Sequence, residues 1–113
     1  MLRISRFDEP HATRLKLEGK VIREWIPEAR RVWVEASNGK ELIIDLFDVT
    51  FVDDWGRRLL TEMHAAGASL VGTGPMIGTL IDDIRREIPR AKPGRVQEVL
   101  FLLFGLLLIF AKS

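Results

Sequence analysis

The chain has 113 residues, enough for one domain with a modest core, and its 17 basic and 16 acidic residues leave a formal charge of +1. That balance gives no electrostatic signature of a nucleic-acid-binding protein. The absence of cysteine excludes disulfides and thiolate metal sites and, together with the absence of an export signal, favours the cytoplasm. The chain has only two histidines, which argues against a catalytic site. We therefore expect no enzymatic activity, metal or cofactor.

The N-terminal part is predicted to be a β-hairpin. Apolar and polar residues alternate over residues 2–5 and again over residues 13–19, which is typical of strands with one buried face. Asp8, Glu9 and Pro10 lie between the two segments and favour a turn.

A helix from about Glu24 to Ser37 is expected next. Its apolar residues recur at helical spacing, Pro27 fits only its first turn, and Asn38-Gly39 supplies a left-handed stop.

The rest of the first 89 residues alternates between strands and helices. The segment "ELIID" shows no alternation, which predicts a strand covered on both faces, and "ASLVG" predicts another strand. A helix ending at Gly67 lies between them, and His64 on it is expected to be a half-exposed surface residue. A third helix runs from Pro75 to Ile88. This order predicts an α/β domain with a mixed sheet covered by helices.

Residues 90–95, "RAKPGR", have the composition of a linker between a domain over residues 1–89 and an apolar C-terminal helix over residues 96–113. From Val99 to Ala111 no residue is charged. A helix of that length spans roughly 20 Å, less than the ~30 Å hydrocarbon core of a membrane. We expect it to be buried between copies in a homo-oligomer. Anchoring at a membrane surface and packing on its own domain remain alternatives.

One motif carries more information than the rest of the chain. The segment "LIIDLFDVTFVDDWGRRLL" places a strand ending in Asp45 before an apolar pair, then Asp53, Gly56 and a helix. This segment resembles the signature of the STAS domain, the fold of bacterial anti-sigma-factor antagonists and of sulfate-transporter tails. "LKLEGKV" is also similar to the second strand of that family. The resemblance covers about residues 2–88 and implies a STAS-like mixed sheet with an N-terminal hairpin.

The sequence departs from the family at its switch. The family commonly has a phosphorylated serine or threonine immediately before the glycine, and here that position is Trp55, preceded by Asp54. The chain therefore lacks the usual phosphoacceptor hydroxyl, and no phosphorylation site is expected.

The resemblance implies a protein-binding module with an anti-sigma factor or a signalling-scaffold protein as partner. The expected docking surface comprises Asp53, Asp54, Trp55, Gly56, Arg57 and Arg58. At least one of the two acids is expected to cap the helix, and Trp55 either packs on the sheet edge or is exposed as a docking anchor. Alternatives are a nucleotide or small-ligand binder and a cytoplasmic component of a membrane transport complex.

Overall fold

The structure is a computed structural model that describes residues 1–90, so the predicted linker beyond Arg90 and the apolar C-terminal helix lie outside the described residues. The elements follow one another as β1 (Leu2–Asp8), β2 (Ala12–Val21), the short 3-10 helix η1 (Arg23–Trp25), α1 (Ile26–Ala36), β3 (Glu41–Val52), α2 (Asp54–Ala65), β4 (Ser69–Val71) and α3 (Pro75–Glu87).

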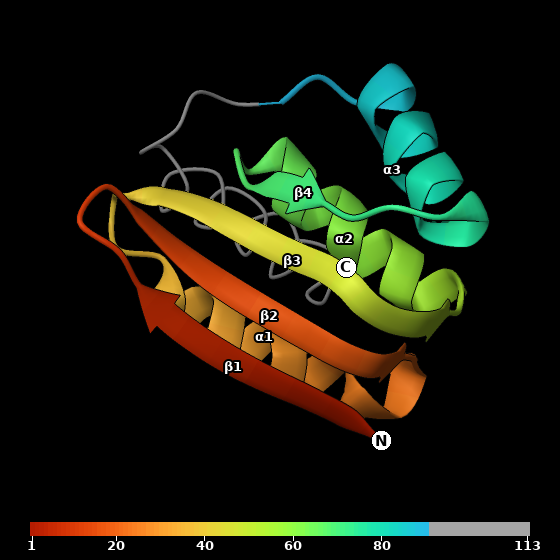
Figure 1. Ribbon diagram of the computed structural model, residues 1–113, viewed down its shortest axis with the longest axis horizontal. Coiled ribbons are helices and arrows are strands. Elements are labelled where there is room, and N and C mark those ends of the chain that lie inside the picture. Colours follow the sequence, from red (N-terminus) through yellow and green to blue (C-terminus); the bar gives the residue numbers. More distant parts are fainter. Residues whose placement is uncertain (91–113) are drawn as a thin grey trace, which may run out of the picture.

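The strands form one mixed sheet in the order β1-β2-β3-β4. β1 and β2 form the expected antiparallel hairpin, and β3 and β4 continue the sheet in parallel. Figure 1 shows α1 and α2 behind the sheet and α3 beyond β4. The α/β fold class with an N-terminal hairpin is therefore confirmed.

β3 differs from its prediction in two respects. It is a single 12-residue strand that continues past Asp45, where the motif placed the end of the strand, to Val52. Leu42, Ile44 and Leu46 are buried whereas Ile43 and Asp45 are only partly buried, so the expectation of a strand covered on both faces is wrong. The reason is that the three buried side chains join the core beneath the helices, while the opposite face remains open to solvent.

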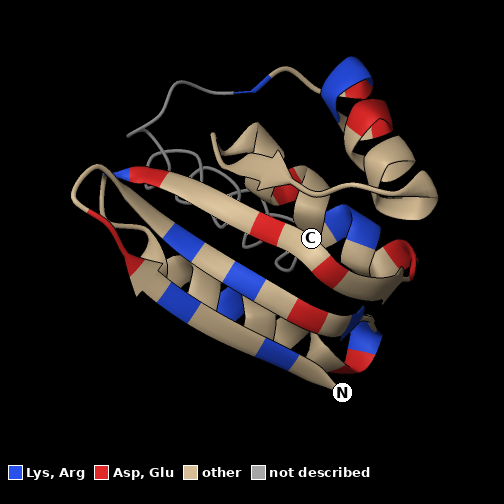
Figure 2. Ribbon diagram, in the orientation of Figure 1, with Lys and Arg blue, Asp and Glu red and all other residues tan. Residues whose placement is uncertain are grey.

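Among residues 1–90, the open face of the sheet carries paired charges and is not covered by a helix. Arg14 lies 3.3 Å from Asp45, and Lys16 lies 2.9 Å from Asp48, each pair joining β2 to β3. Figure 2 shows the acidic positions of β3 running beside the basic positions of β2. This face is therefore compatible with water, which explains how a sheet covered on one side can be stable.

The core lies between the sheet and the helices and includes Leu15, Trp33, Ile44, Leu60 and Ile84. In α1 the buried residues are Ala29, Trp33 and Ala36, which follow the predicted helical spacing. Pro75 begins α3 and its isoleucines face the core, also as predicted. No helix within residues 1–90 is long and apolar enough to cross a membrane.

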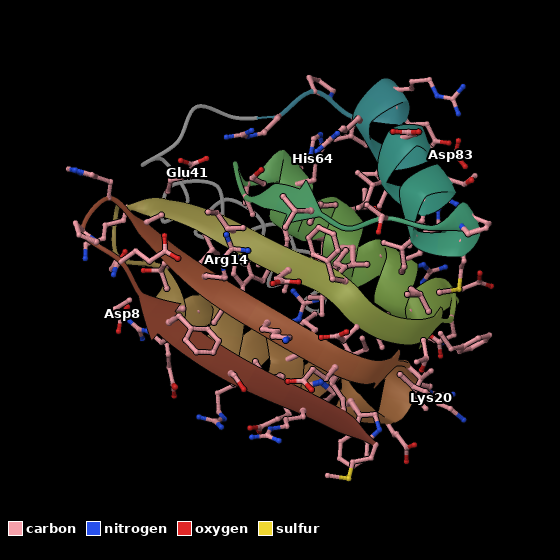
Figure 3. The ribbon with its side chains drawn as sticks, viewed as in Figure 1. Asp8, Arg14, Lys20, Glu41, His64 and Asp83 are labelled. Carbon is pink, nitrogen blue, oxygen red and sulfur yellow. The ribbon has the colours of Figure 1, made fainter. Side chains whose placement is uncertain are left out.

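His64 is not the half-exposed surface residue that the sequence suggested. It is 4% exposed, and its Nε2–H donates a hydrogen bond to the Ile88 carbonyl oxygen at 2.9 Å. The side chain, labelled in Figure 3, thus joins the last turn of α2 to the end of α3. The prediction failed because the contact that buries His64 comes from a residue 24 positions away.

Candidate functional site

The N-terminus of α2 is organised by the carboxylate of Asp53. One oxygen, Oδ1, accepts the backbone N–H of Gly56 at 2.8 Å, and the other, Oδ2, accepts the backbone N–H of Arg23 in η1 at 2.9 Å. The sequence predicted that at least one of Asp53 and Asp54 caps the helix, and Asp53 is the residue that does so. Asp53 also joins η1 to α2.

The hydrogen bonds of Asp53 favour its ionised form. Partial burial by itself would raise the pKa of this carboxyl, but the N–H groups of Gly56, Arg23, Trp55 and Asp53 itself hold the pKa below its usual value. Both oxygens are occupied by the backbone, so this charge serves the fold and is not free to receive a partner.

Gly56 is required by the close approach of α2 to the end of β2. A Cβ at this position would overlap the carbonyl oxygen of Val21 and would lie 2.9 Å from Cγ1 of Val52. The same Val21 oxygen accepts the backbone N–H of Asp53 at 3.2 Å. The glycine of the motif thus lets the first turn of α2 pack directly on two strands.

Trp55 lies on the outside of this first turn and is 46% exposed. The guanidinium carbons of Arg23 and Arg58 lie 5.2 Å and 5.1 Å from the centroid of its ring, within cation–π range. Of the two alternatives left open by the sequence, exposure is the one observed. The two arginines thus contact the indole while part of it remains accessible.

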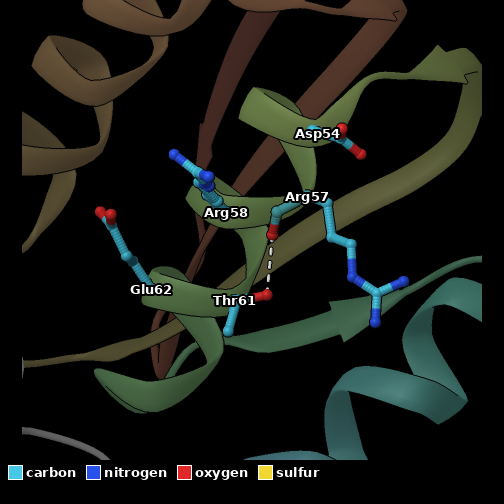
Figure 4. Close-up of a pocket in the computed structure, with 5 residues that line it drawn as sticks. All are labelled: Asp54, Arg57, Arg58, Thr61 and Glu62. Atoms are coloured by element: carbon cyan, nitrogen blue, oxygen red, sulfur yellow. Dashed lines mark hydrogen bonds between the residues drawn. The ribbon is translucent and has the colours of Figure 1, made fainter.

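The two arginines that follow Gly56 leave α2 in different directions, as Figure 4 shows. Arg57 pairs with Glu87 of α3 at 3.3 Å, whereas Arg58 stacks on Trp55. With Asp54, Thr61 and Glu62 they line a shallow surface hollow of about 450 Å³. The Thr61 hydroxyl donates to the Arg57 carbonyl oxygen at 2.7 Å, so it is engaged by the helix itself.

A second hollow, of about 260 Å³, separates the start of α2 from α3. Asp54 lines both hollows and is exposed. Met76, which is also exposed, contributes apolar surface to the second hollow. The predicted surface therefore continues from Trp55 towards α3. Within residues 1–90 no group of His, Asp or Glu side chains has the arrangement of a metal site.

The predicted residues are adjacent in sequence, but the structure divides their roles. Asp53 and Gly56 are structural, whereas Asp54, Trp55 and Arg58 are exposed. Arg23 was missed by the sequence analysis because nothing in its local sequence relates it to Trp55. Its backbone N–H donates to the Asp53 carboxylate, which brings η1 beside the first turn of α2 and the Arg23 side chain to the indole.

Known proteins resemble this chain in structure but not closely in sequence. No family model and no curated protein matches the sequence. The structure of an anti-sigma factor antagonist from Mycobacterium paratuberculosis has a TM-score of 0.63 and 19% identity, covering 90% of this chain and 93% of that one. The structure of an uncharacterized DUF3478-family protein with a SpoIIAA-like fold, from Shewanella loihica PV-4, has a TM-score of 0.56 and 14% identity, covering 81% of this chain and 83% of that one.

These likenesses identify the fold. The chain contains a STAS-like domain with the SpoIIAA-like arrangement of strands and helices, as the motif around Gly56 suggested.

Proposed function

We propose that this protein is a non-enzymatic protein-binding module of the anti-sigma-factor-antagonist type. Its docking surface is the α2 start, defined as Asp53, Asp54, Trp55, Gly56, Arg57 and Arg58. Asp54, Trp55 and Arg58 are its exposed members, whereas Asp53 and the buried Gly56 shape the turn that presents them. The observation that carries the proposal is the exposed indole of Trp55 on the first turn of α2, which lies within cation–π distance of Arg23 and Arg58. Tryptophan and arginine are among the residue types most enriched at interaction hot spots.

The same surface offers no phosphorylation switch of the family's usual kind. A tryptophan occupies the position of the hydroxyl, and the carboxylate of Asp53 is bound to backbone N–H groups, so it does not imitate a phosphate. We infer that binding is constitutive in this respect. The partner is an anti-sigma factor or a signalling-scaffold protein in the cytoplasm.

The test is capture of the partner from the native cell with the tagged full chain and with a Trp55→Ala variant. Loss of a hot-spot indole is expected to weaken binding by about 2 kcal/mol or more, roughly 30-fold. Phe47→Ala is the matched control, because Phe47 is 54% exposed but lies on the open sheet face.

The proposal is supported if the native chain and Phe47→Ala retain an anti-sigma factor or scaffold protein and Trp55→Ala does not. Equal retention by all three would refute the docking assignment. Thermal unfolding of each variant is measured in parallel, because a loss of stability as large as the loss of binding would make Trp55 a folding residue.

Two other functions remain as alternatives to be excluded by experiment. Titration with nucleotides tests a ligand-binding STAS-like domain. Flotation with lipid vesicles tests whether the protein is a component of a membrane transport complex that attaches through residues 99–111.

A further inference from the structure

The two arginines beside Trp55 differ from their neighbours in having no acidic partner. Within residues 1–90, Arg23 and Arg58 form no ion pair, whereas Arg57 pairs with Glu87, and Arg30 pairs with Glu62 at 2.5 Å. Within residues 1–90 no ion pair therefore neutralises these two charges at the place where the exposed indole lies.

Within residues 1–90 the guanidinium groups of Arg23 and Arg58 make no side-chain hydrogen bond and lie within cation–π distance of the ring of Trp55. A guanidinium contacts an aromatic ring through its face, while its N–H donors point outward in its own plane and match the two oxygens of a carboxylate. The exposed part of the Trp55 indole adds an apolar surface beside the two cations. The arrangement combines two donor forks with one apolar contact.

The acidic side chains near Arg23 and Arg58 differ in how far their negative charges are already engaged by other groups. The carboxylate of Asp53 is consumed by backbone N–H groups. Asp54 is exposed and lies in the first turn of α2, where the positive end of the helix dipole offsets part of its charge. Glu24, next to Arg23, is exposed as well. Of these acids, Asp54 and Glu24 are the two that would oppose an anionic partner.

From this charge distribution we infer that the α2 start recognises an acidic segment of its protein partner. Carboxylates of that segment are bound by the guanidinium groups of Arg23 and Arg58, and an apolar side chain between them contacts the exposed part of Trp55. The inference rests on the proposed function and adds the chemistry of the partner. It also assigns a role to Arg23, which lies on a different element from the motif.

The experiment is an NMR titration of the isotope-labelled full chain with two blocked peptides. In the first, aspartates and glutamates surround one leucine; in the second, lysines replace the acids around the same leucine. The acidic peptide is expected to shift the side-chain N–H resonances of Arg23, Arg58 and Trp55, and the basic peptide is expected to leave them unchanged.

Variants locate the effect. The double substitution Arg23→Gln and Arg58→Gln is expected to weaken binding of the acidic peptide about tenfold or more, because it removes both charge-assisted donors. Arg3→Gln, which removes an exposed arginine of β1, is the matched control and is expected to have no effect. Asp54→Asn is expected to tighten binding, because it removes an opposing charge.

Three outcomes would overturn the inference: preferential binding of the basic peptide, unchanged binding of the acidic peptide to the double variant, or tighter binding of an oligothymidylate at the same resonances. The last result would assign the surface to single-stranded nucleic acid. If a partner is captured through Trp55 but the acidic peptide does not bind, the proposed function stands and only the inference that the partner segment is acidic is wrong.

Discussion

Replacing Gly56 with alanine tests how the docking surface is built. In a solvent-exposed helix interior this change stabilises a protein by about 1 kcal/mol, because alanine is the better helix former. At Gly56 the new methyl group would meet the backbone of Val21 and the side chain of Val52. Backbone cannot rotate away, so the first turn of α2 has to move outward.

The outward movement of this turn is expected to lower the free energy of unfolding through two effects. Overpacking of a tight contact costs about 1–3 kcal/mol. The displacement also weakens the 3.2 Å hydrogen bond from the Asp53 N–H to Val21 and the 2.9 Å bond from the Arg23 N–H to the Asp53 carboxylate, and these bonds contribute about 1 kcal/mol and about 1.5–3 kcal/mol. After the gain in helix propensity, we expect a net destabilisation of about 2–4 kcal/mol.

The assay is urea unfolding of the full chain followed by tryptophan fluorescence. Gly78→Ala is the matched control, because Gly78 lies inside α3 and a Cβ there meets nothing within 4 Å. This control is expected to gain about 0.5–1 kcal/mol. If Gly56→Ala is as stable as the native chain, or more stable, the close approach of α2 to β2 does not govern the site.

Asp53→Asn keeps a capping oxygen but removes the charge. Because the folded-state pKa of Asp53 lies below its unfolded value, the charge stabilises the fold above about pH 4 and this contribution is lost as the pH falls through the folded pKa. Acid unfolding curves should therefore show less loss of stability below about pH 4 in Asp53→Asn, and an unchanged slope would contradict the assignment. His64→Phe fills the same space without the N–H donated to Ile88, so we expect a loss of about 1 kcal/mol and faster amide hydrogen exchange at the end of α3. Uniform exchange in α3 of this variant and the native chain would argue against that role. A chain shortened to end at Arg90 is expected to remain folded, since residues 1–90 contain a continuous core, and to be monomeric in light scattering. If the full chain is itself monomeric without detergent, the predicted homo-oligomer is excluded.

The sequence alone was informative wherever structure depends on neighbouring residues. Alternation over β1 and β2, Pro75 at the start of α3 and its isoleucine spacing are local patterns, and each gave the correct element. Capping by Asp53 follows from the same kind of reasoning, because the backbone N–H that its carboxylate accepts belongs to Gly56, three residues further along the chain. These features required no knowledge of the tertiary contacts.

Other features were decided only when distant segments came together. Ile43 is partly exposed because the helices cover one face of the sheet, which no pattern within "ELIID" reveals. His64 is buried by its contact with Ile88, and Trp55 acquires its second cation from Arg23 on η1. The motif could indicate a STAS-like fold and an unusual residue at its switch position. Whether that indole was buried or exposed depended on the packing of η1 against α2, because the energy of such a contact is set by the whole fold and not by residues adjacent in the chain.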